Sequence, residues 1–195
     1  MNTFNLNSRF QIASICFFLA IVFIYGKNKK LPLLSTKYFS VMFVSEGVYL
    51  LCDLASVYTI SHMDTVPAWV NRTVHQFFFI SLEMSVISLY LYVSILQKEQ
   101  KRFHLKQVVF GMLPFVISLV AVIFLPIYYE NSDKGMYSYG PSVIVLYLAL
   151  SYYIILTFEI SFHNFMDKDR RTFLRAGLIV WAIALLFQIL AKQYH

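Results

Sequence analysis

Acidic side chains lie inside the long apolar segments of this chain, and they are the residues best placed to do chemistry. Glu46 and Asp53 lie seven residues apart near the middle of one segment, and Glu83 lies near the middle of the next. A spacing of seven returns to nearly the same face of an α-helix, so Glu46 and Asp53 are predicted to face the same way. No Lys or Arg lies as deep as Glu46 or Glu83. These two carboxyls must therefore be protonated, hydrogen-bonded to neighbours, or holding a cation.

Asp53 has a candidate partner on the following helix. The two segments are predicted to form an antiparallel hairpin, and His75 reaches the depth of Asp53 only if its helix starts early. Asp64 or Thr65 as a helix cap, with Pro67 in the first turn, would allow this. We therefore hypothesise a contact between Asp53 and His75. The alternative is that His75 simply lies at the membrane interface.

The composition shows which elements must position these residues. Of the 195 residues, 59% are hydrophobic and only 13% are charged, and the mean hydropathy is +0.65. A soluble domain is nearer half apolar and a quarter charged. The chain is therefore predicted to be an integral membrane protein with one compact domain, residues 1–195.

Six apolar runs are long enough to be considered as membrane spans. A bilayer core needs about 20 helical residues, and an open sheet edge would leave backbone groups unpaired in lipid. The sequence therefore predicts an all-α, polytopic helix bundle with about six transmembrane helices. The runs are Phe10–Tyr25, Tyr38–Ile60, Val74–Leu96, Val108–Tyr128, Ser142–Phe165 and Phe173–Leu190.

The basic residues predict how the bundle is oriented. Twelve of the sixteen Lys and Arg residues follow the first, third and fifth runs, or begin the sixth. The positive-inside rule places these three connections in the cytoplasm and the N-terminus outside. The net charge of +6 is explained by the positions of these basic residues in the predicted cytoplasmic connections. Nucleic acid is therefore not expected as a partner, and the expected partner is the lipid bilayer. The outer connections Ser61–Thr73 and Tyr129–Pro141 are expected to be loops.

Two interpretations of the intramembrane polar residues stay open. One is a polar pocket between the second, third and fifth runs, which would recognise a small ligand or a proton and would include Tyr147. The other is a set of polar fasteners between helices, worth roughly 0.6 kcal/mol each. Ser81, Ser85 and Ser88 share one helical face and suit close packing. Glu159 lies nearer the cytoplasmic end of its run, where it can reach the interface.

Familiar catalytic patterns are absent from the sequence. It contains no Gly-rich phosphate loop and no H-E-x-x-H motif. Cys16 and Cys52 both fall inside apolar runs and are interpreted as packing residues, so no metal or other cofactor is expected. The sequon at Asn71–Thr73 is a weak pattern. We predict no catalytic residues and no enzymatic activity in this chain.

Three stretches resemble a known family. "DLASVYTISHMDTVPAWVNRTVHQFFFISLEMSVISLYLYV" (Asp53–Val93) resembles the multi-pass membrane input region of bacterial GGDEF diguanylate cyclases, and similar regions occur on sensor histidine kinases. "YSYGPSVIVLYLALSYY" (Tyr137–Tyr153) matches a Tyr-x-x-Gly entry to the fifth span. "RRTFLRAGLIVWAIALLFQIL" (Arg170–Leu190) matches a basic loop followed by a sixth span.

The resemblance implies a sensor in the bacterial cytoplasmic membrane. Such a domain couples an external or in-membrane signal to a cytoplasmic output, here cyclic di-GMP signalling, and takes an unidentified small ligand. The output domain of the family is not present in the sequence. Six spans would place His195 outside, so the chain is either a fragment lacking a further span and an output domain or a short free-standing relative.

Other functions and assemblies stay open. A small-solute or ion transporter or channel is the main alternative, since midplane carboxylates suit that class. A membrane-embedded enzyme is a third. The chain could also act as a homodimer or through a cytoplasmic partner.

Overall fold

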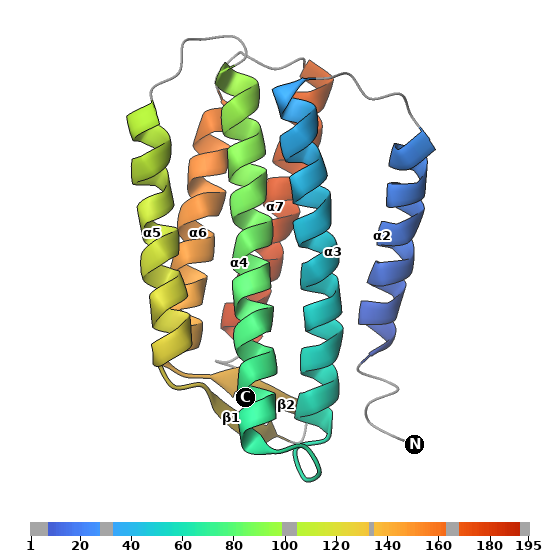
Figure 1. Cartoon of the computed structure of the whole chain (residues 1–195), viewed down its shortest axis with the longest axis vertical. Coiled ribbons are helices and arrows are strands. Elements are labelled where there is room, and N and C mark those ends of the chain that lie inside the picture. Colours follow the sequence, from blue (N-terminus) through green and yellow to red (C-terminus); the bar gives the residue numbers. More distant parts are fainter. Residues whose placement is uncertain (1–7, 28–32, 99–104, 133–134, 163–167, 192–195) are drawn as a thin grey trace.

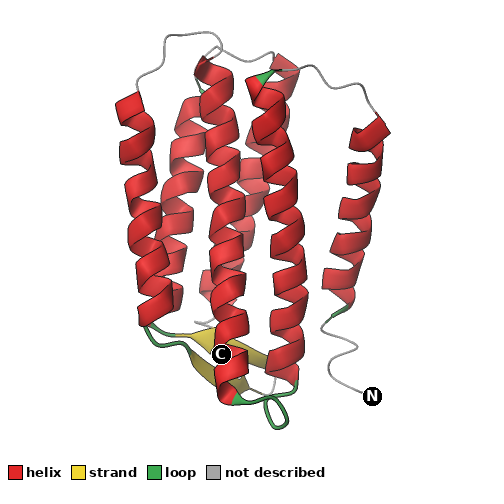
Figure 2. Cartoon of the chain, viewed as in Figure 1, coloured by secondary structure: helices red, strands yellow, loops and turns green. Residues whose placement is uncertain are grey.

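The computed structural model describes residues 8–27, 33–98, 105–132, 135–162 and 168–191. Within these ranges the chain forms a bundle of six α-helices with one β-hairpin at one end (Figures 1 and 2). The elements in chain order are α2 (Arg9–Lys27), α3 (Leu34–Ser61), α4 (Ala68–Lys98), α5 (Leu105–Phe124), β1 (Tyr128–Ser132), β2 (Gly135–Tyr139), α6 (Pro141–Ser161) and α7 (Lys168–Ala191).

Each of the six predicted apolar runs contributes a helix. Among the described residues, four helices are long and apolar enough to cross a bilayer, namely α2, α3, α6 and the Ala68–Leu96 part of α4. The apolar stretches of α5 and α7 are shorter, Gly111–Phe124 and Leu174–Ile183. The prediction of a helical membrane protein is therefore confirmed at this level, and the number of six passes stays a prediction.

The ends of α4 and α5 differ from the predicted spans. The carbonyl of Pro67 accepts hydrogen bonds from the N–H groups of Val70 and Asn71 at 2.9 and 3.1 Å, so α4 begins early. This is the early start that the hypothesis about His75 required. Helix α5 ends at Phe124, two residues before Pro126, because the residue preceding a proline disfavours helical geometry.

The outer connection Tyr129–Pro141, predicted as a loop, contains a short β-hairpin, whereas the predicted all-α fold class is confirmed by the six described helices. Strands β1 and β2 pair in antiparallel register, from Tyr128 opposite Tyr139 to Ser132 opposite Gly135. Aromatic side chains favour strands, and the Tyr128 and Tyr139 rings lie 5.5 Å apart. Gly140 then turns the chain into α6 with φ of 124°, and a Cβ there would lie 2.9 Å from the Tyr128 ring.

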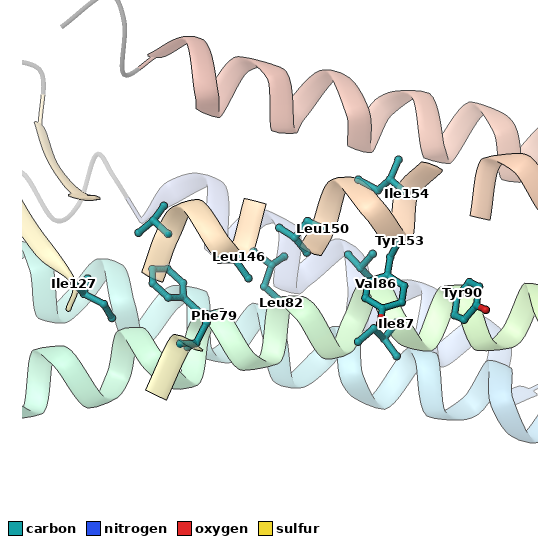
Figure 3. Close-up of a cluster of buried hydrophobic side chains, with 12 residues drawn as sticks. Phe79, Leu82, Val86, Ile87, Tyr90, Ile127, Leu146, Leu150, Tyr153 and Ile154 are labelled. Atoms are coloured by element: carbon teal, nitrogen blue, oxygen red, sulfur yellow. The ribbon is translucent and has the colours of Figure 1, made fainter. Parts of the chain in front are cut away.

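The main cluster of buried apolar side chains lies between α4 and α6, with Val122 of α5 and Ile127, the residue before β1, added to it. Tyr153 is 0% exposed and Leu146 and Leu150 are each 1% exposed, so they are fully enclosed by protein. Figure 3 shows the α4 and α6 side chains of this cluster lying against one another. We call this group the core cluster: Phe79, Leu82, Val86, Ile87, Tyr90, Val122, Ile127, Val143, Leu146, Leu150, Tyr153 and Ile154.

Helices α2 and α7 lie at the periphery. Among the described elements α2 packs only against α3, and none of its residues is buried (Figure 1). Helix α7 packs along α6, where Arg175 donates a hydrogen bond to the carbonyl of Ser161 at 2.9 Å. This bond satisfies a carbonyl at the C-terminus of α6, where a cation is favourable.

The basic connections lie at one end of the bundle. The C-terminal ends of α2 and α4 and the start of α7 are at the end opposite the hairpin (Figure 1). Several basic residues assigned to the cytoplasmic side lie outside the described residues, namely Lys29, Lys30, Lys101 and Arg102. The arrangement is compatible with the predicted orientation, which stays a prediction.

Candidate polar sites between the helices

The carboxyl of Glu46 lies at the interface between α3 and α4. It accepts a hydrogen bond from the hydroxyl of Ser85. One turn away, the hydroxyls of Ser45 and Ser88 lie 2.7 Å apart. Ser85 and Ser88 are buried, so the predicted serine face of α4 does pack against a neighbouring helix. Small polar residues let helices approach closely in a membrane, and Glu46 adds a hydrogen bond across this interface.

Asp53 has a partner that the sequence analysis missed. The Gln11 side chain of α2 lies near enough to the Asp53 carboxyl to act on it as a hydrogen-bonding group. Gln11, Phe18 and Tyr25 recur every seven residues and form the face of α2 that lies against α3. Phe18 packs on Gly47, and the Tyr25 hydroxyl lies 3.3 Å from the Ser40 hydroxyl. The signal in the sequence was this spacing, with Gln11 as a polar residue at the start of an apolar run.

Tyr49 links the two carboxyls of α3 to a further helix. The charges of both Asp53 and Glu46 act on its phenol, so all three groups lie on a shared side of α3. Its ring stacks on Phe78 of α4 at 6.0 Å and lies 6.5 Å from Trp181 of α7. The predicted common face of Glu46 and Asp53 is compatible with this, although the two carboxyls bind different helices. We call this group the α3 cluster: Gln11, Glu46, Tyr49, Asp53 and Ser85.

Glu83 lies on the other side of α4, facing α5 and α6. It is 0% exposed, and neither carboxyl oxygen has a hydrogen-bond partner. Ser118 of α5 is near enough to act on this carboxyl and is 1% exposed, yet its hydroxyl is unpartnered as well. A negative charge on Glu83 would interact electrostatically with the phenol of Tyr153 on α6. We call these three residues the Glu83 site.

Tyr153 also bonds to the backbone of α5. Its hydroxyl donates to the carbonyl of Gly111 at 2.7 Å and accepts from the N–H of Phe115 at 3.1 Å. A regular α-helix pairs these two groups with each other, since they are four residues apart. The hydroxyl therefore occupies the turn that contains Pro114, and proline is a residue at which helices commonly kink. The sequence could not indicate this contact, because it depends on how α6 is rotated.

His75 does not contact Asp53 in the structure. Its Nδ1 lies 3.0 Å from the carbonyl of Asn71, and its ring packs edge-on against Tyr129 at 5.0 Å. Burial raises the pKa of Tyr129 to about 12, and the charge of Arg72 partly opposes this rise. Asn71 is 2% exposed, so a glycan attached at the predicted sequon would not fit in this fold.

The remaining predicted site residues lie apart from these groups. Tyr147 is partly buried against the core cluster. Glu159 is exposed near the C-terminal end of α6. The six predicted residues, Glu46, Asp53, His75, Glu83, Tyr147 and Glu159, therefore do not surround one pocket. The structure distributes them over the α3 cluster, the Glu83 site, the hairpin end and the surface.

The chemistry available at these positions is proton exchange and hydrogen bonding. Within the described ranges, no group of three or more His, Cys, Asp or Glu residues could hold a metal ion. Comparison of the chain with protein-family models, with curated proteins and with solved structures finds no match. The arguments below therefore use this chain's own residues.

Proposed function

We propose that this protein is a membrane-embedded sensory input domain that couples an external or in-membrane signal to a cytoplasmic signalling output. The observation that carries the proposal is the contrast in how the helices are attached. The core cluster joins α4 to α6 through enclosed side chains, whereas α2 has no buried residue and packs on α3 alone. A helix attached by one face can move without disrupting the core.

A sensor needs two arrangements of similar energy, between which the signal selects. The interface between α2 and α3 has suitable contacts, namely one polar pair and a group of aromatic rings. Tyr25 packs on Phe43 at 4.9 Å and on Phe39 at 5.1 Å, and Phe18 lies 6.0 Å from Phe43. Flat rings allow sliding, while Gln11 and Asp53 supply a bond that a signal can make or break.

Spin-label distances across this interface test the proposal. Cys16 of α2 is exposed and can carry one label, with Leu51→Cys on α3 as the second site and Cys52→Ser removing the other thiol. In nanodiscs of thin and thick bilayers, at acidic and neutral pH, we expect two distances whose populations change. Met84→Cys with Leu148→Cys, both exposed, gives the matched pair on α4 and α6 and should show one distance throughout. One unchanged distance for both pairs would contradict the proposal.

The expected output would be cyclic di-GMP synthesis in the bacterial cytoplasmic membrane, through an attached domain or a partner. An antibody against residues Gln97–Lys106 can measure the size of the native product in source membranes. We expect a band well above 22.8 kDa if an output domain is attached. A band at 22.8 kDa would require a separate partner protein.

A small-solute or ion transporter is the second candidate, favoured by one observation. Glu83 is a fully buried carboxyl near the middle of α4, and such residues mark ion pathways in many membrane proteins. Proteoliposomes that contain a pH-sensitive dye separate the two functions. The sensor predicts no proton flux above that of protein-free vesicles, whereas a proton transporter would acidify or alkalinise the lumen.

A further inference from the structure

The Glu83 site contains a buried carboxyl that lacks a hydrogen-bond partner on both of its oxygens. Both carboxyl oxygens of Glu83 and the hydroxyl of Ser118 are enclosed and unpartnered. Most buried polar groups in proteins are hydrogen-bonded, so an unpartnered carboxyl needs a physical explanation. Its neighbours Val86 and Leu82 belong to the apolar core cluster. Surface water therefore does not supply the missing hydrogen bonds of the Glu83 carboxyl.

An ionised carboxylate at this position would be uncompensated. The described groups that act on Glu83 are the Ser118 hydroxyl and the Tyr153 phenol, and neither carries a positive charge. Burying an isolated carboxylate costs far more than burying the neutral acid, and a group in this situation neutralises by taking up a proton. Hydroxyl groups suit the neutral acid, because a protonated carboxyl can both donate and accept hydrogen bonds.

We propose that Glu83 is a proton-binding site, with Ser118 of α5 and Tyr153 of α6 as the hydroxyls that face its carboxyl. In the neutral form the carboxyl donates its proton toward Ser118 and stays compatible with the apolar surroundings. Release of the proton leaves a negative charge between α4, α5 and α6. The bound species is a proton alone, and no covalent bond other than the O–H bond of the carboxyl forms or breaks.

Proton release at Glu83 would change the hydrogen bonds that Tyr153 makes to the backbone of α5. The Tyr153 hydroxyl now donates to Gly111 in the turn that contains Pro114. A carboxylate at Glu83 competes for this donor, since hydrogen bonds to charged acceptors are stronger than those to neutral carbonyls. If the phenol turned to the carboxylate, the Phe115 N–H and the Gly111 carbonyl would lose the hydroxyl that now bonds to both of them. The proton therefore selects between two bonding patterns of one helical turn.

Other titratable groups near the site must be separated from Glu83 in any measurement. On α6, Tyr152 lies beside Tyr153, and on α4 Tyr90 contacts the Tyr153 ring at 5.6 Å. On α5, the described neighbour is the non-titrating Ser118. On α3, Glu46 bonds to Ser85, two residues from Glu83, and belongs to the α3 cluster.

Infrared spectroscopy of the full chain in nanodiscs tests the proposal directly. We expect the carbonyl stretch of a protonated carboxylic acid at neutral pH, lost in Glu83→Gln and retained in Glu46→Gln and Glu159→Gln. Ser118→Ala should shift this band to higher frequency, because the carboxyl loses its hydrogen-bonding hydroxyl. If Glu83→Gln does not fold, the Ser118→Ala shift still decides. A wild-type spectrum without such a band, or a band that neither variant alters, would overturn the proposal.

The pH dependence of unfolding supplies an independent test. Because the folded chain would hold a proton that the unfolded chain releases, stability should fall as pH rises above about 4.3, the usual value for a free Glu. The folding equilibrium constant would fall by up to about tenfold per pH unit. Glu83→Gln should lack this component, so it should match the wild type near pH 4 and be the more stable of the two at neutral pH. A wild-type stability that rises with Na⁺ at fixed ionic strength, and does not in Glu83→Gln, would instead show an ionised carboxylate that binds Na⁺.

Discussion

The interface between α4 and α6 encloses large side chains completely, whereas the interface between α2 and α3 leaves every residue of α2 at least partly exposed. Tyr153 and Leu150 fit between neighbouring side chains of the core cluster. Phe18 and Tyr25 instead lie on the surface of α3. Lipid tails are as apolar as leucine, so apolar burial alone does not hold helices together in a bilayer. Close packing and polar contacts must do so, and α2 has few of either.

Leucines on α6 provide the variant with the largest expected effect. Leu150 is 1% exposed and Leu148 is 67% exposed, and both lie on the same helix. Leu150→Ala should lower the free energy of unfolding by about 2–5 kcal/mol, because it leaves a cavity in the core cluster. Leu148→Ala, which faces outward, should cost under about 0.5 kcal/mol. Unfolding in mixed micelles with increasing SDS measures both, and equal costs would contradict the assignment of this core.

Tyr153→Phe should have the next largest effect. It removes the hydroxyl bonded to Gly111 and Phe115, and we expect a loss of about 1–3 kcal/mol, since buried backbone groups lose their partner. Tyr152→Phe is the matched control, because Tyr152 is 39% exposed on the same helix. The same SDS titration applies. If the two variants behave alike, the bond to α5 contributes nothing measurable.

Glycine-to-alanine changes compare the two interfaces at the level of one methyl group. A Cβ at Gly47 would lie 3.1 Å from the Phe18 ring of α2, whereas a Cβ at Gly26 would meet nothing within 4 Å. Gly47→Ala should therefore push α2 outward and lengthen the spin-label distance between α2 and α3. Its effect on unfolding should stay within about 1 kcal/mol, because alanine favours the helix. Gly26→Ala should leave the distance unchanged.

The polar pair between α2 and α3 should contribute little to global stability. Gln11→Leu and Asp53→Asn should each cost about 0.6 kcal/mol, the average for polar contacts between membrane helices. The informative result is their coupling. A double-mutant cycle should show that the two changes together cost less than the sum of each alone. Additive costs would remove Gln11 as the partner of Asp53.

The hairpin end should respond to alkaline pH. The pKa of Tyr129 is raised from its ordinary value of 10.0 to about 12 by burial. Above pH 10 the unfolded chain ionises this phenol first, so stability should fall as pH rises between these two values. Arg72→Gln should raise the Tyr129 pKa further, because the charge of Arg72 favours the phenolate. Phenolate absorbance, taken as the difference from Tyr129→Phe, checks both expectations.

Several features of the fold followed from the sequence because they depend on local composition. The apolar runs predicted helices, since only helices satisfy the backbone within one segment of lipid-embedded chain. Ser81, Ser85 and Ser88 predicted a packed face on α4, and all three are buried. The β-hairpin was missed because its pairing joins two short polar segments that have little hydrophobic pattern of their own.

The sequence by itself determined that Glu46, Asp53 and Glu83 lie deep in apolar helices and that the first two share a side of one helix. Only the tertiary structure decided that Asp53 faces Gln11, that Glu46 faces Ser85, and that Glu83 lies apart from both. The reason is rotational. Sequence spacing defines angles within a helix, but the rotation of each helix against its neighbours is set by how side chains from several helices interlock.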